Sequence, residues 1–312
     1  MIQLINIARP KTFIIIMLKM SKTSILEFSI KQHEFIQQLP QDNNNITLIL
    51  VREITDLVLK RYAAATATIA TKGPIFIITD TYYPKNKVQE YPTLNILYFF
   101  EDICYKNGYC YARQSKQVTA WDRCLFFLAN YTNLYKYTWI LEDDVAIGGP
   151  HALNIFFNRY NTVKADFIGQ NMNIDNKDIQ ECGLAESGLT NIVAVYTPFC
   201  RLSRKFIEIL HQFVRIKNRL FNLNILFASL CVTCNLPIQL FAKDLISQIR
   251  PTPSIRYDET ISTSISYPFF YPVKDNDLWQ KIYDTDRFPV QYPAFHNPKN
   301  DEEWHAILKL IR

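Results

Sequence analysis

The sequence predicts an α/β protein built on a mostly parallel sheet with helices on its faces. From Gly73 onward, short apolar segments rich in β-branched and aromatic residues alternate with longer amphipathic segments. With 48% hydrophobic and 14% aromatic residues, the chain can bury a substantial core. Three consecutive acids, Glu142, Asp143 and Asp144, end one of the apolar segments, and ligands of open α/β sheets bind at such strand ends.

Residues 1–72 are predicted to form an N-terminal extension, partly helical, with a polar break at 41–45. The main domain is expected over 73–312, as a first half at 73–150 and a second half at 151–312. The first half should contain strands at 74–79, 93–100 (or a strand-helix junction) and 108–111, a helix at 118–130 and a strand ending in the three acids.

The second half continues the alternation. The expected elements are a helix near 152–160, a strand at 165–168, an acidic loop over 175–186, a strand at 192–197 and a helix from 203 to about 220. The uncharged stretch 220–242 is long enough to span a membrane, but five Asn, Pro and Gln residues interrupt it. A buried helix followed by a buried strand is therefore expected there. From residue 250 on, abundant Pro and Tyr indicate irregular structure over one end of the sheet.

Composition excludes several kinds of site. The chain has only seven glycines, and neither Gly-x-Gly-x-x-Gly nor the P-loop pattern occurs, so acids and a metal must hold any nucleotide phosphates. The net charge of +5 is modest and scattered, so nucleic acid is not an expected partner. Two short basic clusters have the spacing of solvated helix faces that could also hold an anion: Arg201, Arg204 and Lys205, and Arg215, Lys217 and Arg219.

The seven cysteines lie mostly in apolar stretches and are odd in number. Cys231 and Cys234 form a single C-x-x-C pair without a second pair or a histidine at zinc spacing, so core thiols in a reducing compartment are expected. The apolar run 13–18 is too short for a membrane span and short for a signal-peptide core. These features predict a cytoplasmic protein.

The acid triplet is the main candidate for chemistry. On an extended chain, Glu142 and Asp144 share one side and Asp143 faces the other. Hard oxygen ligands at a strand end suit Mg²⁺ or Mn²⁺, and such an ion can bridge to a diphosphate. The alternative is a solvated acidic turn with no ligand.

Three segments together resemble the GT-A class of nucleotide-sugar glycosyltransferases, whose D-x-D signature often reads Glu-Asp-Asp. They are Trp139–Val145 (WILEDDV), Thr119–Arg123 (TAWDR) and Tyr271–Lys274 (YPVK), and the resemblance covers about residues 73–275. It implies a GT-A-like, Rossmann-type fold, a Mn²⁺ or Mg²⁺ cofactor and a nucleotide-sugar donor, with a UDP-sugar favoured. The acceptor would be a glycan or protein hydroxyl, and the sugar moved a hexosyl or N-acetylhexosaminyl group.

The resemblance also implies roles for single residues. Asp144 would contact the metal, with Glu142 and the late His296 as further metal candidates. Glu142 and Asp143 would bind the donor ribose or metal-bound waters, Asp80 would lie near the base or ribose, and Asp122 would border the donor pocket. Lys274 or Arg201 would supply the cation that offsets the charge of the departing diphosphate.

The catalytic base is the open point. Inverting GT-A enzymes use an Asp or Glu, often near the start of a helix in the second half. No acid occurs between Glu208 and Asp244, and the helix start offers Asn222 and Asn224 instead. The candidate bases are therefore Glu186, Asp178 and Asp166.

Other functions stay open as alternatives. A GT-A-like binding or assembly protein without activity would explain the missing helix acid. A nucleotidyltransferase would want a Gly- and Lys-rich loop after the first strand, which 81–86 matches poorly. A haloacid-type phosphatase would want a second Asp two residues after Asp80, where Tyr82 stands.

Overall fold

The computed structural model describes residues 45–56, 58–59, 62–63, 73–80, 95–111, 117–131, 135–147, 157–171, 184–242, 246–248 and 269–271. A seven-stranded sheet has the order β3-β2-β1-β4-β7-β6-β8. Its strands are β1 (Asn45–Val51), β2 (Ile75–Thr79), β3 (Ile96–Leu97), β4 (Tyr137–Glu142), β6 (Phe167–Asn171), β7 (Val195–Ser203) and β8 (Ile238–Leu240). Within this sheet only β7 is antiparallel to its neighbours, β4 and β6, and the other pairs are parallel. The predicted mostly parallel α/β sheet is confirmed.

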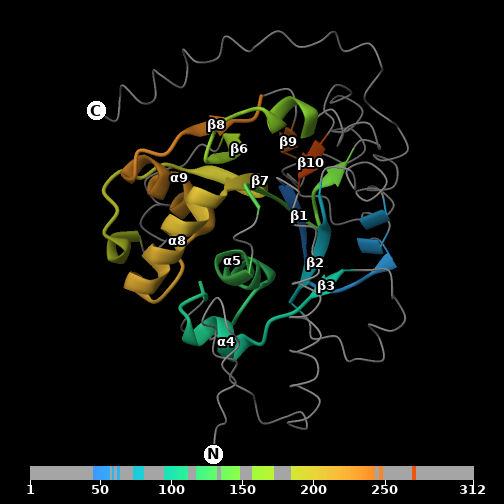
Figure 1. Ribbon diagram of the computed structural model, residues 1–312, viewed down its shortest axis with the longest axis horizontal. Helices are drawn as coiled ribbons and strands as arrows, with labels where there is room; N and C mark the ends of the chain where they lie inside the picture. The colour runs from blue at the N-terminus through green and yellow to red at the C-terminus, as the bar shows by residue number, and fades with distance from the viewer. Residues whose placement is uncertain are drawn as a thin grey trace, which may run out of the picture.

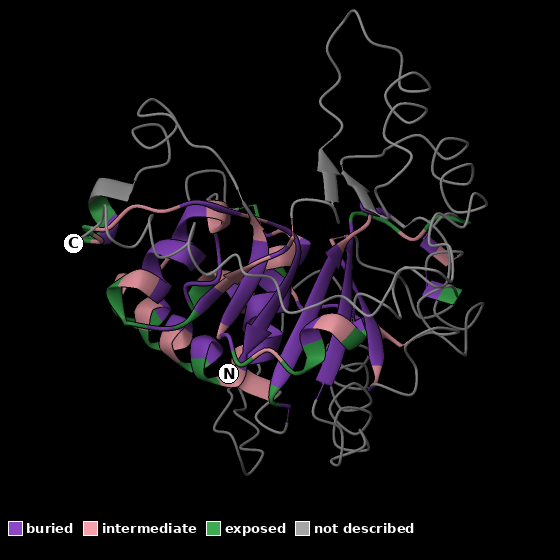
Figure 2. Ribbon diagram, turned by 90° about the horizontal axis from the view of Figure 1, so that it is seen from above, coloured by how far each residue is buried: buried purple, intermediate pink, exposed green. Residues whose placement is uncertain are grey.

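Helices α4 (Glu101–Lys106), α5 (Ala120–Tyr131), α8 (Arg204–Lys217) and α9 (Leu223–Thr233) lie together on one side of the strands (Figure 1). Strand side chains alternate between two cores because successive residues point to opposite faces. Leu48 and Leu50 pack with these helices, whereas Ile49 and Val51 pack with Phe157 and other residues of the opposite face. Figure 2 shows that the strands are buried and that the exposed and half-buried residues lie mainly on the helices and loops.

Strand β1 was not predicted. All seven of its residues are buried, and it pairs in parallel with β2 on one side and β4 on the other. Its sequence, NITLILV, ends in the apolar run Leu48–Val51, of the kind that a parallel strand covered on both faces requires. Residues 45–51, which follow a polar run, were expected in the N-terminal extension. The sheet instead begins at Asn45, before the expected start of the main domain at Gly73.

One other predicted strand is absent from the described residues. The predicted strand at 108–111 is a turn after α4, because Gly108 has φ +81° and the N–H of Tyr109 returns to the carbonyl of Cys104 at 2.9 Å. Over the described residues 95–100, the two-residue β3 leads into α4, which agrees with the strand-helix junction expected at 93–100. Beyond residue 250, β10 (Phe269–Tyr271) pairs with β5 (Ala146–Ile147) and β9 (Ile246–Gln248) in a small second sheet.

The uncharged stretch 220–242 forms the buried α9 and then β8, as predicted. Within the described ranges, every helix falls short of the length and apolar character that a membrane crossing requires. Five of the six cysteines in the described part of the chain are buried free thiols, which confirms their place in the core, and Cys234 is exposed.

Gly73 lies two residues before β2 and against Asn45 at the start of β1, and its replacement by alanine is expected to be destabilising. Its φ is +147°, and a Cβ there would lie 2.0 Å from the Asn45 carbonyl oxygen. Because backbone must shift to relieve this overlap, Gly73→Ala should lower the free energy of unfolding by about 1–3 kcal/mol in urea titrations.

Gly188→Ala is the matched control for this substitution. Gly188 also has positive φ, at +72°, but its added Cβ meets only the flexible end of Lys217, at 3.2 Å. A loss of about 1 kcal/mol or less is expected from φ alone. Equal losses in the two variants would contradict the proposed clash with β1.

Candidate functional site

The candidate site lies at the carboxyl edge, by which we mean the edge of the sheet where β2 ends at Thr79 and β4 ends at Glu142. Strand β1 lies between them, with Val51 opposite Thr79 and Leu50 opposite Glu142. Asp80 follows β2 directly, and its N–H donates to the carbonyl of Val51 at 3.0 Å. Two strand spacings separate the ends of β2 and β4 by about 10 Å, so Asp80 and the acid triplet face a common region.

The acid triplet occupies the end of β4 and a tight turn. Asp143 and Asp144 are the turn residues, and the N–H of Val145 returns to the carbonyl of Glu142 at 3.2 Å. All three acid side chains are half-buried. The indole N–H of Trp121, in the first turn of α5, donates to Glu142 Oε1 at 2.5 Å. The turn therefore places three half-buried acids in succession at the carboxyl edge, and the first of them is held by α5.

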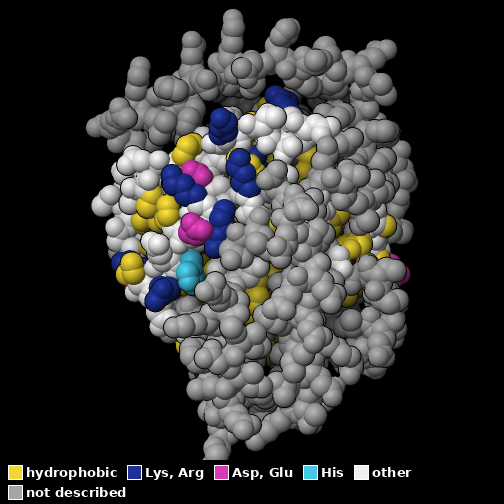
Figure 3. All heavy atoms as spheres, in the orientation of Figure 1, with side chains coloured by type: hydrophobic (Ala, Val, Ile, Leu, Met, Phe, Trp, Pro, Cys, Tyr) yellow, Lys and Arg dark blue, Asp and Glu magenta, His cyan; other side chains and the backbone are white. Residues whose placement is uncertain are grey.

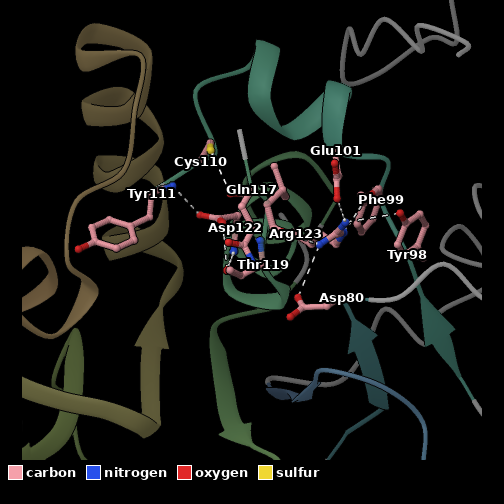
Figure 4. Close-up of polar contacts among 11 residues, drawn as sticks. Asp80, Tyr98, Phe99, Glu101, Cys110, Tyr111, Gln117, Thr119, Asp122 and Arg123 are labelled. Carbon is pink, nitrogen blue, oxygen red and sulfur yellow. Dashed lines mark hydrogen bonds and ion pairs between the residues drawn. The ribbon is translucent and has the colours of Figure 1, made fainter. Parts of the chain in front are cut away.

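Asp80 is held by the fully buried guanidinium of Arg123, also in the first turn of α5. Arg123 Nη1 lies 3.6 Å from Asp80 Oδ1, and Nη2 lies 3.7 Å from Glu101 Oε1. The same guanidinium donates to the carbonyls of Phe99 at 2.8 Å and Val118 at 2.5 Å. Figure 4 shows Arg123 at the centre of these groups, so it joins the ends of β2 and β3 to the start of α5.

Asp122 caps α5. Its carboxylate accepts from the N–H and hydroxyl of Thr119 at 2.8 and 2.9 Å and from the N–H of Tyr111 at 3.0 Å, as Figure 4 shows. Thr119 Oγ1 in turn accepts from the N–H of Asp122 at 3.4 Å, which completes a capping box. Since Asp122 is only 1% exposed and its acceptors are used, the structure gives it a structural role. A contact of Asp122 with a donor stays a prediction.

The titration of Asp80 gives a testable pH dependence. Burial raises the pKa of Asp80 to about 6, against the opposing attraction of Arg123. The native state therefore binds this proton more tightly than the unfolded chain, and the free energy of unfolding falls as pH rises from about 4 to about 6. Because the Asp80 side chain is 31% exposed, we expect a fall of only about 1–2 kcal/mol.

Urea unfolding of wild type and Asp80→Asn across this pH range measures the effect. The variant should show a flatter profile, because asparagine does not titrate. Some slope should remain, since burial also raises the pKa of Asp122 to about 6. An unchanged slope in Asp80→Asn would show that Asp80 does not titrate in this range.

No protein-family model and no curated protein matches this chain. Among solved structures, it is similar to an active-site mutant of LgtC, at 7% identity and a TM-score of 0.45 over 76% of this chain and 94% of that one. It is also similar to apo mouse xyloside xylosyltransferase 1, at 7% identity and a TM-score of 0.40 over 73% of this chain and 97% of that one. Likenesses this distant leave the function to be argued from the residues of this chain.

The predicted metal residues were Asp144, Glu142 and His296. His296 lies outside the described residues, and within the described ranges no three His, Cys, Asp or Glu side chains gather as a metal cage. Mg²⁺ commonly takes only one or two protein carboxylates and completes its shell with water and phosphate oxygens. The half-buried carboxylates at the end of β4 fit an ion of that kind, and they do not fit a closed structural metal site.

Asp166 is removed from the candidate bases by its position. It precedes β6, its carbonyl accepts from the N–H of Ser203 at 2.8 Å, and Ser203 pairs with Tyr137 at the start of β4. Asp166 therefore lies at the opposite edge, about 17 Å from the end of β4 along the strand. Its carboxylate instead accepts from the Ser203 hydroxyl, and Ser203 caps α8 by accepting from the N–H of Phe206.

Of the other candidate bases, Asp178 lies outside the described residues. Glu186 is exposed in the short 3₁₀ helix Leu184–Ser187 and forms an ion pair with Arg219 at 2.7 Å. At the start of α9, Asn222 caps the helix, and Asn224 accepts from the N–H and hydroxyl of Thr197 at 2.9 and 2.8 Å. Among these positions only Glu186 offers a described carboxylate that remains a candidate base.

The prediction that Arg201 binds an anionic donor is wrong for a physical reason. Arg201 is fully buried on β7 opposite Trp139, and its guanidinium donates to the carbonyls of Tyr160, Val163 and Ala165 at 2.6, 2.5 and 3.0 Å. It also lies 3.9 Å from the centre of the Tyr137 ring, and desolvation lowers its pKa to about 10. The Arg201 guanidinium is therefore bound within the core and does not reach a donor. The other predicted cation, Lys274, lies outside the described residues.

The basic residues of α8 are, by contrast, at the surface. Figure 3 shows lysine and arginine side chains gathered over this helix. Arg204 pairs with Glu208 at 2.9 Å, one turn along, and Arg219 pairs with Glu186. Lys205 and Arg215 are exposed, as expected for a solvated helix face, whereas Arg204 is half-buried and also donates to the carbonyl of Leu128 at 2.9 Å, and Arg219 follows the end of α8.

Proposed function

We propose that the protein is a metal-dependent glycosyltransferase that moves a sugar from a nucleotide-sugar donor to a glycan or protein hydroxyl. One observation carries the proposal: the Glu142–Asp144 turn and Asp80 lie at the same edge of a parallel sheet, flanking β1. Carboxylates at that edge are suited to a cation and a nucleotide, because open α/β sheets bind ligands there.

In this proposal Asp144, with Glu142, would hold Mn²⁺ or Mg²⁺. The bound ion would neutralise charge that develops on the departing nucleoside diphosphate. Asp80 would accept a hydrogen bond from the ribose, and Asp143 would orient ribose or metal-bound water. A UDP-sugar is the favoured donor, from the resemblance of the acid triplet to the Glu-Asp-Asp signature.

Lys274 remains the proposed cation that assists departure of the diphosphate. Support comes from β10, which runs antiparallel to β5, with Phe270 opposite Ala146. Its last residue, Tyr271, is therefore level with Val145, directly after the acid triplet, and precedes Lys274 by three positions in sequence. Of the YPVK segment, the described residue Tyr271 therefore lies close in register to the acid triplet.

A donor-binding protein without transfer activity is the second candidate. The start of α9 favours this second candidate, because Asn222 and Asn224 stand where an Asp or Glu that acts as catalytic base is often found. Both asparagine side chains accept hydrogen bonds from backbone N–H groups. This protein would keep nucleotide binding and lack turnover. Under the glycosyltransferase proposal, Glu186 or Asp178 supplies the base.

Release of nucleoside diphosphate from a panel of UDP-, GDP- and ADP-sugars, with Mn²⁺ or with chelator, tests the proposal. We expect Mn²⁺-dependent release with one donor, reduced in Glu142→Gln and unchanged in Glu208→Gln, which alters a surface acid of α8 in the same way. Binding without release would favour the second candidate. Neither binding nor release with any donor would contradict both.

A further inference from the structure

We propose that Trp121 is a positioning residue for the acid triplet: its indole N–H fixes the Glu142 carboxylate in the orientation that meets the metal and nucleotide. The inference rests on the proposed function and deepens it. It assigns a role in ligand affinity to a side chain of α5 whose ring packs against α9.

The bond itself is short and joins different elements. Trp121 Nε1 lies 2.5 Å from Glu142 Oε1, across 21 residues of sequence, and links the first turn of α5 to the last residue of β4. An N–H that donates to a carboxylate forms a charge-assisted hydrogen bond, stronger than one between neutral groups. Glu142 is therefore held at the one position of the triplet that is still part of the strand.

The indole ring is fixed from its other side by α9. Trp121 is half-buried, and its ring meets Phe227 edge-on, with centroids 6.0 Å apart and an angle of 72°. Phe227 is fully buried and packs in turn on Phe167 and Phe206. The donor atom therefore sits on a ring with little freedom to rotate.

The helix turn that carries Trp121 is also fixed. Its neighbours Asp122 and Arg123 are 1% and 0% exposed, and they bind Thr119, Tyr111 and the ends of β2 and β3. Trp121 and Arg123 thus extend from one helical turn to two acids, Glu142 and Asp80, on either side of β1. With its backbone anchored in this way, Trp121 can restrict the rotamers of Glu142.

The consequence should appear as weaker ligand binding. Groups that orient a metal ligand typically contribute about 10- to 100-fold to metal affinity or activity. Trp121→Phe keeps an aromatic ring against Phe227 and deletes the N–H. We expect it to raise the dissociation constant for UDP with Mg²⁺, and the KM for the donor, by about 10-fold, with a smaller change in kcat.

The first test examines the bond without any ligand. The chain has four tryptophans, so a ¹⁵N-labelled sample gives four indole N–H resonances, and Trp121→Phe identifies the one from Trp121. Glu142→Gln replaces the charged acceptor with a neutral one and should move that resonance upfield. An unchanged Trp121 resonance in Glu142→Gln would overturn the inference.

The second test separates positioning from general stability. Trp139→Phe makes the same substitution at a fully buried position of β4 and should lower the melting temperature at least as much as Trp121→Phe. UDP binding in the presence of Mg²⁺, measured by calorimetry, should weaken in Trp121→Phe and not in Trp139→Phe. Equal weakening in both variants would overturn the positioning role.

Failure of the proposed function would look different. If wild type binds no nucleoside diphosphate and releases none from any donor, the proposed function and the ligand role of Trp121 fall together. The indole spectrum would still report whether Trp121 holds Glu142. If wild type binds UDP with Mg²⁺ and Trp121→Phe binds it equally well, only the inference about Trp121 is overturned.

Discussion

Replacing Asp144 with alanine is expected to lower kcat/KM for the nucleotide-sugar by about 100-fold or more. Asp144 ends the carboxylate turn after β4, and in the proposed mechanism it is the acid that contacts the metal. A metal that neutralises developing charge on a leaving diphosphate contributes several kcal/mol to transition-state stabilisation, and this is lost with its ligand. The rate of nucleoside diphosphate release at saturating and limiting donor measures the loss.

Asp102→Ala is the matched control, since Asp102 pairs only loosely with Lys106 on α4, at 3.7 Å, and lies outside the proposed site. It should leave donor turnover unchanged. Raising the Mn²⁺ concentration should restore part of the activity of Asp144→Ala if the variant binds the ion weakly. An Asp144→Ala variant as active as wild type would remove the acid triplet from the mechanism.

Arg123→Met is expected to cause the largest loss of stability, about 3–5 kcal/mol in the free energy of unfolding. The guanidinium is fully buried, donates to two main-chain carbonyls and faces the carboxylates of Asp80 and Glu101. Methionine fills much of the volume but leaves these acceptors without their donor. Leaving buried acceptors unpaired lowers the free energy of unfolding far more than losing an exposed ion pair does. Urea unfolding with a common m-value measures the difference.

Arg219→Met is the corresponding control at the surface. Arg219 also pairs with an acid, Glu186, but the two side chains are 29% and 69% exposed. Exposed ion pairs contribute little, so a loss of about 1 kcal/mol or less is expected. If Arg123→Met were no worse than Arg219→Met, the buried cluster would not hold the ends of β2 and β3 to α5.

The sheet and its helices could largely be predicted because their patterns are local. The apolar run before Glu142 and the amphipathic segment before it became β4 and α5, and the uncharged stretch 220–242 became α9 and β8. Strand β1 was missed because a polar run precedes it, and pairing with β2 and β4 cannot be read from seven residues alone. The turn at Gly108 was missed, although a glycine just after a helix commonly takes the positive φ observed there.

The site could be predicted only in part. The sequence pointed to Asp80 and the acid triplet, because both follow strand-like runs and parallel strands end at one edge. Neither the bond between Trp121 and Glu142 nor the contacts of Arg123 were predicted, although an arginine within the apolar run of α5 and the Thr119-x-x-Asp122 spacing are usable signals. It misassigned Arg201 and Asp166, since burial and strand direction depend on how β6 and β7 pair.

The most direct test of the central claim is thermal unfolding of wild type and Asp144→Ala with UDP, GDP or CMP, each with Mn²⁺ and with chelator. A ligand at about 100 times its dissociation constant stabilises the native state by about 2.7 kcal/mol, a readable shift. We predict a Mn²⁺-dependent shift of the wild type with one nucleotide, absent in Asp144→Ala. No shift with any nucleotide, or an equal shift in the variant, would contradict a metal-dependent nucleotide site at the end of β4.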